Sequence, residues 1–181
     1  PGARTRLERL ERLGEIAAAR RALKAGKPEL ALELLGRQYL EAPEDPAVLR
    51  AFGEALAALK RHREAADVLT LAVAQEPTDP GLSRLTANSL WEAGRTDEAW
   101  KLLVSAHAQA TPEMKREIEA QRRSWHVQEA EALKARGDLA GALERYRVAY
   151  AEGPHSGEVL RGIAGVYWAA DQVALASRYY A

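Results

Sequence analysis

The sequence contains no cysteine, and aromatic residues make up only 6% of its 181 residues. The absence of cysteine excludes disulfide bonds and leaves a periplasmic and a cytoplasmic location equally open. Alanine, by contrast, is abundant, and it is the best helix former and a poor strand former. The composition therefore favours closely packed helices over a β-sandwich.

Neither sign of charge is in excess, because 26 Lys and Arg residues balance 26 Asp and Glu residues. Without a net charge the chain has no overall field that would attract nucleic acid or an anionic membrane. No apolar run approaches the roughly 20 residues that are needed to span a bilayer. We therefore expect no nucleic-acid partner and no membrane insertion of this segment.

The sequence also lacks the short motifs of common active sites, such as G-x-S-x-G, H-E-x-x-H, C-x-x-C and the phosphate-binding loop of nucleotide hydrolases. No histidine is followed by a second one after three or four residues, the spacing that places two metal ligands on one helix face. The histidines are His62, His107, His126 and His155. We therefore expect no catalytic residue, no cofactor and no metal, and we do not expect the chain to be an enzyme.

A corner motif occurs twice in the chain. The segment EAPEDP (41–46) returns as QEPTDP (75–80), with both prolines and the aspartate displaced by 34 residues. The first proline of the motif ends a helix, the aspartate caps the next helix, and the second proline suits the first helical position. Glycines at other turns, Gly26, Gly94 and Gly137, are predicted to end helices as C-caps.

Small residues follow the same period. Alanine recurs at Ala31, Ala65 and Ala99, and about a dozen residues before each of them lie Ala19, Gly53 and Ala87. Small residues that face each other allow two helices to approach to about 8 Å. Each unit is therefore predicted to be a pair of amphipathic helices, which span about 46–59 and 62–75 in the second unit.

This pattern resembles the tetratricopeptide repeat family in its paired small residues, in the large apolar residue after the second alanine, and in the closing proline. Two more units fit, through Ala130 and Ala142 in one and Ala164 and Ala176 in the other. The resemblance implies an all-α, right-handed superhelical solenoid of antiparallel helix pairs, with about five units of which the last is incomplete. We expect further repeats of a longer chain to adjoin it. The early tryptophan that is usual in the family is missing from every unit.

One interval breaks the period, because Ala99 and Ala142 are 43 residues apart. No Pro or Gly interrupts residues 113–136, so we predict one long helix that Thr111 caps. Its extra length of about 13 Å is expected to redirect the superhelix near 112–123, with Trp125 packing where the third unit meets the fourth. The predicted division is 1–11 as an N-terminal helical extension, 12–111 as units one to three, 112–123 as an extended helix or hinge, and 124–181 as units four and five.

In tetratricopeptide repeat proteins the first helix of each unit lines a concave groove that binds a protein or a peptide. The residues predicted to point into this groove are Arg50, Glu54, Arg84, Asn88, Trp91, Glu131, Lys134, Arg161 and Trp168. The two tryptophans hold the same place in their units. Each of them either anchors a partner or covers a neighbouring helix.

Some members of the family grip a C-terminal carboxylate with basic and asparagine residues from three units. Arg84 and Asn88 resemble the first pair of that clamp. The following units offer Gln128, Glu158 and Gly162 where an asparagine and two basic residues are needed. The clamp is therefore incomplete, and chaperone-tail binding is not expected.

The resemblance implies a non-enzymatic scaffold for protein–protein interaction. Phrases such as ALKARGDLAGALERYRVAYAEGP (132–154) resemble, more weakly, the periplasmic repeat scaffold of bacterial exopolysaccharide export proteins such as the cellulose-synthase outer-membrane subunit. That likeness implies a periplasmic segment that links the synthesis machinery to an outer-membrane pore. Two alternatives stay open: a cytoplasmic or lipoprotein scaffold of a pilus or secretion complex, and a carbohydrate-binding surface built on Trp91 and Trp168.

Overall fold

The computed structural model describes the backbone of residues 2–180 and the side chains of residues 9–179. The backbone it describes is helical apart from short turns and contains no β-strand. The helices are α1 (Gly2–Lys24), α2 (Pro28–Glu41), α3 (Pro46–Ala58), α4 (His62–Gln75), α5 (Pro80–Glu92), α6 (Thr96–Gln109), α7 (Pro112–Ala135), α8 (Leu139–Glu152), α9 (Gly157–Ala169) and α10 (Val173–Tyr180).

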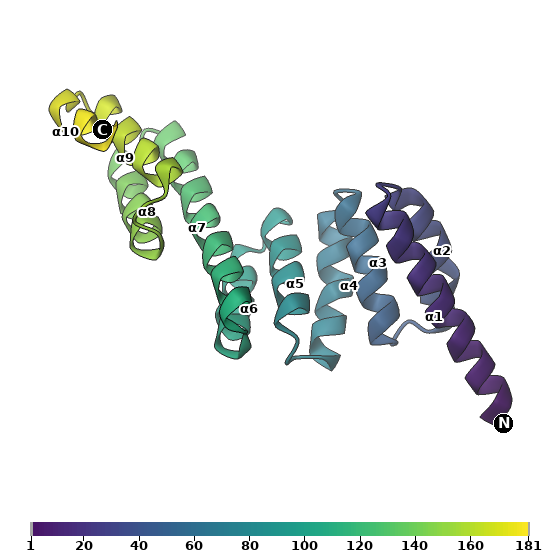
Figure 1. The fold of residues 1–181 in the computed structure, drawn as a ribbon. Coiled ribbons are helices and arrows are strands. Elements are labelled where there is room, and N and C mark those ends of the chain that lie inside the picture. The colour runs from purple at the N-terminus through teal and green to yellow at the C-terminus, as the bar shows by residue number, and fades with distance from the viewer. Residues whose placement is uncertain (1, 181) are drawn as a thin grey trace. The chain divides into compact units, whose positions relative to one another are not determined.

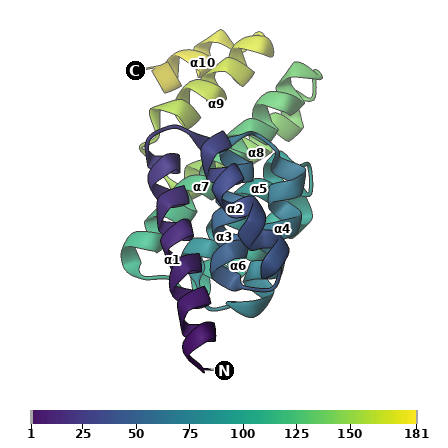
Figure 2. The same cartoon turned by 90° about the vertical axis from the view of Figure 1, so that its right-hand side faces the viewer.

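These helices pack in consecutive pairs, and the chain divides into two compact units, residues 1–110 and residues 111–181. The first unit contains the pairs α1/α2, α3/α4 and α5/α6, and the second contains α7/α8 and α9/α10. Within the first unit, α2 also contacts α3, and α4 contacts α5, so that the pairs form a row (Figure 1). Figure 2 views this row from its α1 end. The fold is an all-α repeat solenoid, as the sequence predicts.

The repeated corner is built as its residues predict. One carboxylate oxygen of Asp45 accepts hydrogen bonds from the backbone amides of Ala47 and Val48, at 3.0 and 3.4 Å, at the start of α3. Asp79 caps α5 in the same way, with amide–carboxylate distances of 2.8 and 3.0 Å. A proline occupies the first turn of both helices.

The prediction of one long helix is also confirmed. Helix α7 contains 24 residues, and the Thr111 hydroxyl accepts a hydrogen bond from the backbone amide of Met114 at its start. Residues 112–123 are thus part of a continuous helix, and Trp125 within it is fully buried. The N-terminal extension is helical too, because α1 begins at Gly2. The hinge role of residues 112–123 stays a prediction.

Small residues form the seam of each helix pair. The side chains of Ala19, Ala31, Ala65, Ala87 and Ala99 are all 0% exposed. At the remaining seam position of the first unit, Gly53, even a methyl group would overlap the side chain of Leu69 on the facing helix. The register predicted from the 34-residue period is therefore confirmed.

The turn inside each pair contains one residue in the left-handed backbone region. The predicted C-cap glycines Gly26, Gly94 and Gly137 have φ values of 70°, 83° and 84°. In the other two pairs the same place is taken by Lys60, with a φ of 61°, and by Asp171, with a φ of 59°. Because no glycine stands at these two places, the sequence alone did not indicate which residue of the turn is left-handed.

We predict that Ala99→Leu destabilises the first unit by about 1–3 kcal/mol, because the seam has no free volume for a larger side chain. The measurement is urea unfolding followed by circular dichroism. Ala108→Leu, on the exposed side of the same helix, is the matched control and should leave the free energy of unfolding nearly unchanged. Equal stability of the two variants would show that the seam is placed wrongly.

A second prediction concerns Lys60. A left-handed conformation costs a residue with a Cβ roughly 1 kcal/mol or more relative to glycine, so Lys60→Gly should raise the free energy of unfolding by about that amount. Gly94→Lys, the reverse change at the equivalent turn, should lower it similarly. Both changes are measured by thermal and urea unfolding, and a loss of stability in Lys60→Gly would contradict the assigned backbone conformation.

Candidate protein-binding surface

Five predicted groove residues lie on the first helices of two pairs in the first unit. Arg50 and Glu54 are on α3, and Arg84, Asn88 and Trp91 are on α5. Residues three or four positions apart share one face of a helix, so each helix presents its members together. All five side chains are partly buried. We call this set the first-helix face.

Arg50 is committed to the structure of the solenoid. Its Nη1 atom donates to the Asp79 carboxylate at 2.5 Å, and its Nε atom donates to Glu54 at 3.2 Å. The same relation joins the preceding pairs, because Arg12 Nη1 on α1 donates to Asp45 Oδ2 at 3.0 Å. In both cases an arginine of one first helix binds the aspartate that caps the next first helix. Arg50 and Glu54 therefore help to hold consecutive repeats together.

The contacts of Asp79 set its charge state. Burial by itself would raise the pKa of the Asp79 carboxyl group, but amide hydrogen bonds from Leu82 and Gly81 and the charge of Arg50 lower it more. The net effect places the pKa of Asp79 below its ordinary value. Asp79 is thus ionised at neutral pH, both as a helix cap and as an ion-pair partner.

Trp91 is the aromatic member of the first-helix face. Its ring meets that of Trp100 on α6 edge to face, with the ring centres 6.0 Å apart and the planes at 87°. Such a pair is favourable and orients the Trp91 ring, and the residue as a whole is partly exposed. Trp91 therefore combines a structural contact with partial exposure to solvent.

The second unit carries four more predicted residues, Glu131 and Lys134 on α7 and Arg161 and Trp168 on α9. Lys134 forms an ion pair with Glu131 at 2.6 Å, and the hydroxyl of buried Tyr146 donates a hydrogen bond to the same carboxylate. Burial and this hydrogen bond raise the pKa of the Tyr146 hydroxyl group. Burial by itself would raise the pKa of the Glu131 carboxyl group, but the hydrogen bonds from Lys134 and Tyr146 lower it more. Glu131 and Lys134 thus pair with each other on one helix.

Trp168 differs from Trp91, although both hold the same place in their repeats. Trp168 is 63% exposed, whereas Trp91 is partly buried. The position that Trp100 occupies in its repeat is taken by Ser177 in the last pair, so Trp168 lacks the equivalent aromatic neighbour. Arg161, on the same helix, is also exposed.

The residues at the later clamp positions provide no basic group. Gln128 and Glu158 are exposed. Gly162 is buried, and a methyl group there would overlap the ring of Tyr146 on α8. Gly162 is therefore needed for close helix packing, as the helical pattern around it suggests, and not for recognition of a carboxylate.

Sequence reasoning missed a hollow of about 330 Å³ between α4, α5 and α6. It is lined mainly by apolar groups, which include Val73, Leu90 and Leu102. No motif marks such a site, because the hollow depends on which side chains fill the space between α4 and α6, the second helices of two consecutive pairs. The available signal was a comparison of equivalent positions in consecutive repeats.

Helices long and apolar enough to cross a membrane do not occur in the described part of the chain. Among residues 9–179, no group of three or more His, Asp or Glu side chains is placed to hold a metal ion. The buried His126 has its pKa lowered to about 4, first by burial and then by the charges of Arg145 and Arg122. It is therefore neutral at physiological pH.

Comparison with known proteins agrees with this geometry. A tetratricopeptide repeat family model matches residues 22–89. Residues 22–89 thus match the tetratricopeptide repeat. The matched segment contains both corners and the seam residues from Ala31 to Ala87, and the helices outside it also pack in consecutive pairs. No curated protein sequence matches the chain.

Several solved structures of MamA share the fold. MamA from Desulfovibrio magneticus RS-1 is 19% identical, with a TM-score of 0.63 over 93% of this chain and 90% of that one. Another MamA structure is 13% identical, with a TM-score of 0.64 over 93% of this chain and 87% of that chain. At such low identity the likeness concerns the fold alone. It supports the all-α repeat fold described above.

We predict that Asp79→Asn lowers the free energy of unfolding at pH 7 by up to about 1 kcal/mol, because asparagine still caps α5 but loses the ion pair with Arg50. The lowered pKa of Asp79 stabilises the fold above the ordinary pKa of about 4, and this contribution is lost as pH falls through the folded value. The difference between the variant and the unmodified chain should therefore vanish in acid.

The measurement for Asp79 is urea unfolding at a series of pH values. Glu76→Gln, which removes an exposed carboxylate next to the same corner, is the matched control and should show little difference at any pH. A stability difference for Asp79→Asn that stays constant down to pH of about 2 would contradict the assigned role of its charge.

Proposed function

We propose that the chain is a non-enzymatic scaffold that binds a protein or peptide partner on its first-helix face. The observation that supports this most directly is Trp91, which is oriented by Trp100 and remains partly exposed beside Arg84 and Asn88 on α5. Tryptophan and arginine are the residues most enriched among those that dominate binding energy at protein interfaces. An oriented tryptophan also loses little conformational entropy when a partner covers it.

The groups around Trp91 suggest how a partner would be recognised. Arg50 and Glu54 are engaged with each other and with Asp79, so they provide a fixed polar border. Trp91 supplies the apolar contact, and Asn88 and Arg84 lie one turn and two turns before it on the same helix. A partner segment with an apolar residue and hydrogen-bonding groups fits this arrangement.

We further propose that the chain is part of a bacterial exopolysaccharide export protein and acts in the periplasm. The support is the resemblance of the Ala-, Arg- and Leu-rich repeat phrases at 132–154 to the repeat scaffold of such proteins. In this role the repeats would link the synthesis machinery to an outer-membrane pore, with further repeats adjoining this segment. A reporter fusion that is active only after export, made in the source organism, tests the compartment. A cytoplasmic reporter signal would overturn this finer proposal and leave the scaffold function in place.

The binding surface is tested with Trp91→Ala. We predict that this change weakens partner binding by more than about 1 kcal/mol, or about fivefold, without loss of helical content. Partners are captured by photo-cross-linking from an amino acid analogue placed at Asn88 in the source organism. The affinity of the captured partner is then measured for the unmodified chain and the variant.

Val104→Ala, at an exposed position on α6, is the control and should bind the partner normally. If Trp91→Ala binds the partner as well as Val104→Ala does, the first-helix face is not the binding surface. A melting temperature that falls together with binding would assign Trp91 to the core and would likewise count against the proposal.

Carbohydrate binding is a second candidate, which the exposure of Trp168 favours. A flat, exposed aromatic ring can stack on the apolar face of a sugar, and this ring is 63% exposed. Titration of β-glucan oligosaccharides, followed by tryptophan fluorescence, tests the idea. A change that disappears in Trp168→Ala supports glycan binding, and an unchanged spectrum in the unmodified chain excludes these oligosaccharides as ligands.

A further inference from the structure

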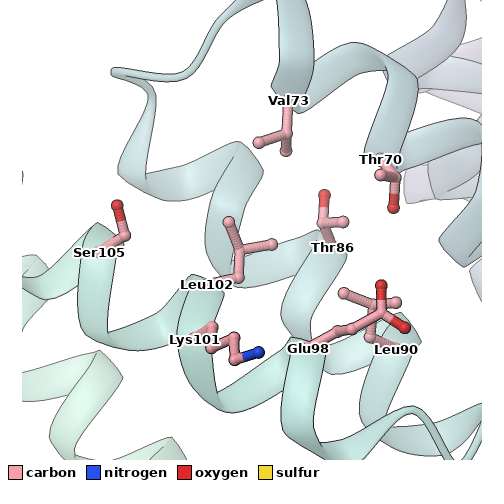
Figure 3. Close-up of a pocket in the computed structure, with 8 residues that line it drawn as sticks. All are labelled: Thr70, Val73, Thr86, Leu90, Glu98, Lys101, Leu102 and Ser105. Atoms are coloured by element: carbon pink, nitrogen blue, oxygen red, sulfur yellow. The ribbon is translucent and has the colours of Figure 1, made fainter.

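The hollow between α4, α5 and α6, which we call the α4–α6 hollow, lies between two second helices and has α5 at its base. Figure 3 shows the side chains around it, from Thr70 and Val73 on α4, Thr86 and Leu90 on α5, and Glu98, Lys101, Leu102 and Ser105 on α6. Its volume of about 330 Å³ is open to solvent on one side. It is separate from the first-helix face, whose members do not line it.

The equivalent furrow one repeat earlier is filled. There the rings of Tyr39 and Phe52 stack in parallel, with their centres 4.4 Å apart and their planes at 3°. Both rings pack on the cluster that contains Leu56 and Val68. Tyr39 and Phe52 thus occupy the space between α2 and α4 from within the chain.

A shift of 34 residues converts one furrow into the other. Val73 stands where the earlier repeat has Tyr39, and Thr86 stands where it has Phe52. The other two apolar positions of the wall are apolar in both furrows, because Leu90 and Leu102 correspond to Leu56 and Val68. The hollow therefore exists because two stacked aromatic rings are replaced by two small side chains, and its walls are suited to a bulky apolar group.

The polar groups at the hollow favour a ligand that carries a hydrogen-bond acceptor. The hydroxyls of Thr70 and Thr86 already donate to the carbonyl oxygens of Ala66 and Leu82, at 2.7 and 2.9 Å. Glu98 is held by two hydrogen bonds from Arg95, each of 2.8 Å.

The two remaining polar groups that line the hollow, on Lys101 and Ser105, are both hydrogen-bond donors. Among residues 9–179 the ammonium group of Lys101 and the hydroxyl of Ser105 form no hydrogen bond within the chain. The hydrogen bond from Arg95 is the main cause of the lowered pKa of the Glu98 carboxyl group, and the charge of Lys101 adds a smaller contribution. They lie four positions apart on α6 and so share one face of that helix. In the filled furrow the position of Lys101 is taken by Asp67, which accepts a hydrogen bond from Arg95 at 2.8 Å. The charge at the edge of the furrow is thus reversed where the furrow is empty.

We propose that the α4–α6 hollow is a second docking site, which takes a bulky apolar side chain, preferably aromatic, from a segment of a partner protein that also carries a carboxylate for Lys101. The apolar group replaces the missing ring pair, and the carboxylate satisfies the two free donors. A protein segment fits better than a free small molecule, because sites for small molecules enclose most of the ligand and this hollow is open on one side.

The probe is a capped helical peptide of about 15 residues that presents Trp and Glu at i and i+4 in an alanine and glutamine host. Two comparison probes are the same peptide with Lys in place of Glu, and free N-acetyltryptophan. Binding to the full chain is followed by amide chemical shifts in NMR spectra. We expect the Trp–Glu peptide to shift the amides of Thr86, Lys101 and Ser105, and to bind at least about fivefold more tightly than either comparison probe.

Two variants make the test specific. Val73→Tyr together with Thr86→Phe rebuilds the filled furrow of the earlier repeat and should abolish binding while the chain stays folded, because it reproduces a packing that the chain already contains. Lys101→Asp changes only an exposed side chain, so it does not depend on repacking, and it should remove the preference for the Trp–Glu peptide.

Several results would overturn the proposal. Equal affinity for the Glu and Lys peptides would remove the role of Lys101. Binding of N-acetyltryptophan as tight as that of the peptide would assign the hollow to a free small molecule. Shifts confined to the surroundings of Trp91, or binding that persists in the variant with the filled furrow, would place the peptide elsewhere. The last result would leave the first-helix face intact as the proposed partner site.

Discussion

The close contact of small residues inside each helix pair is the constraint on which the rest of this structure depends. Ala65 and Ala99 have no exposed surface, and at Gly53 there is no room for a methyl group beside Leu69. Leu69 and Leu103, each four residues after a seam alanine, are fully buried and fill the flank of the contact. Once two helices are held this close, the faces that can meet the next pair or a partner follow from helix geometry.

Contacts between successive pairs use residues that the corner already requires. Asp79 caps α5 and also binds Arg50 of the preceding first helix, and Asp45 and Arg12 repeat this relation one step earlier. Part of the polar surface that lines the first helices is thus committed to holding the row together. Recognition of a partner then falls to the side chains between these contacts, above all Trp91.

Positions outside the seam and the corner vary between repeats, and this variation creates the differences between surfaces. Tyr39 and Phe52 fill one furrow, while Val73 and Thr86 leave the next one open. Trp91 has Trp100 beside it, while Trp168 has a serine at the equivalent position and is mostly exposed. A solenoid can change such sites singly, because each repeat contacts only its neighbours.

The sequence by itself determined the helix pairs, the caps at Asp45, Asp79 and Thr111, the seam alanines and the long helix α7. These features follow from local propensity and from a period along the chain. It also determined which residues share the first-helix face, because helical spacing fixes that. Whether those residues act in binding stays a prediction, since no partner contact follows from the fold.

Tertiary structure alone decided the pairing of Arg50 with Asp79, the need for glycine at 162 beside Tyr146, the left-handed turn at Lys60, and the α4–α6 hollow. Each of these depends on how residues on different helices, or the two ends of a turn, meet after packing. No local pattern in the sequence indicates that such groups approach each other. Arg50 and Asp79 are 29 residues apart in the chain, and they meet only because the packed helices bring them together.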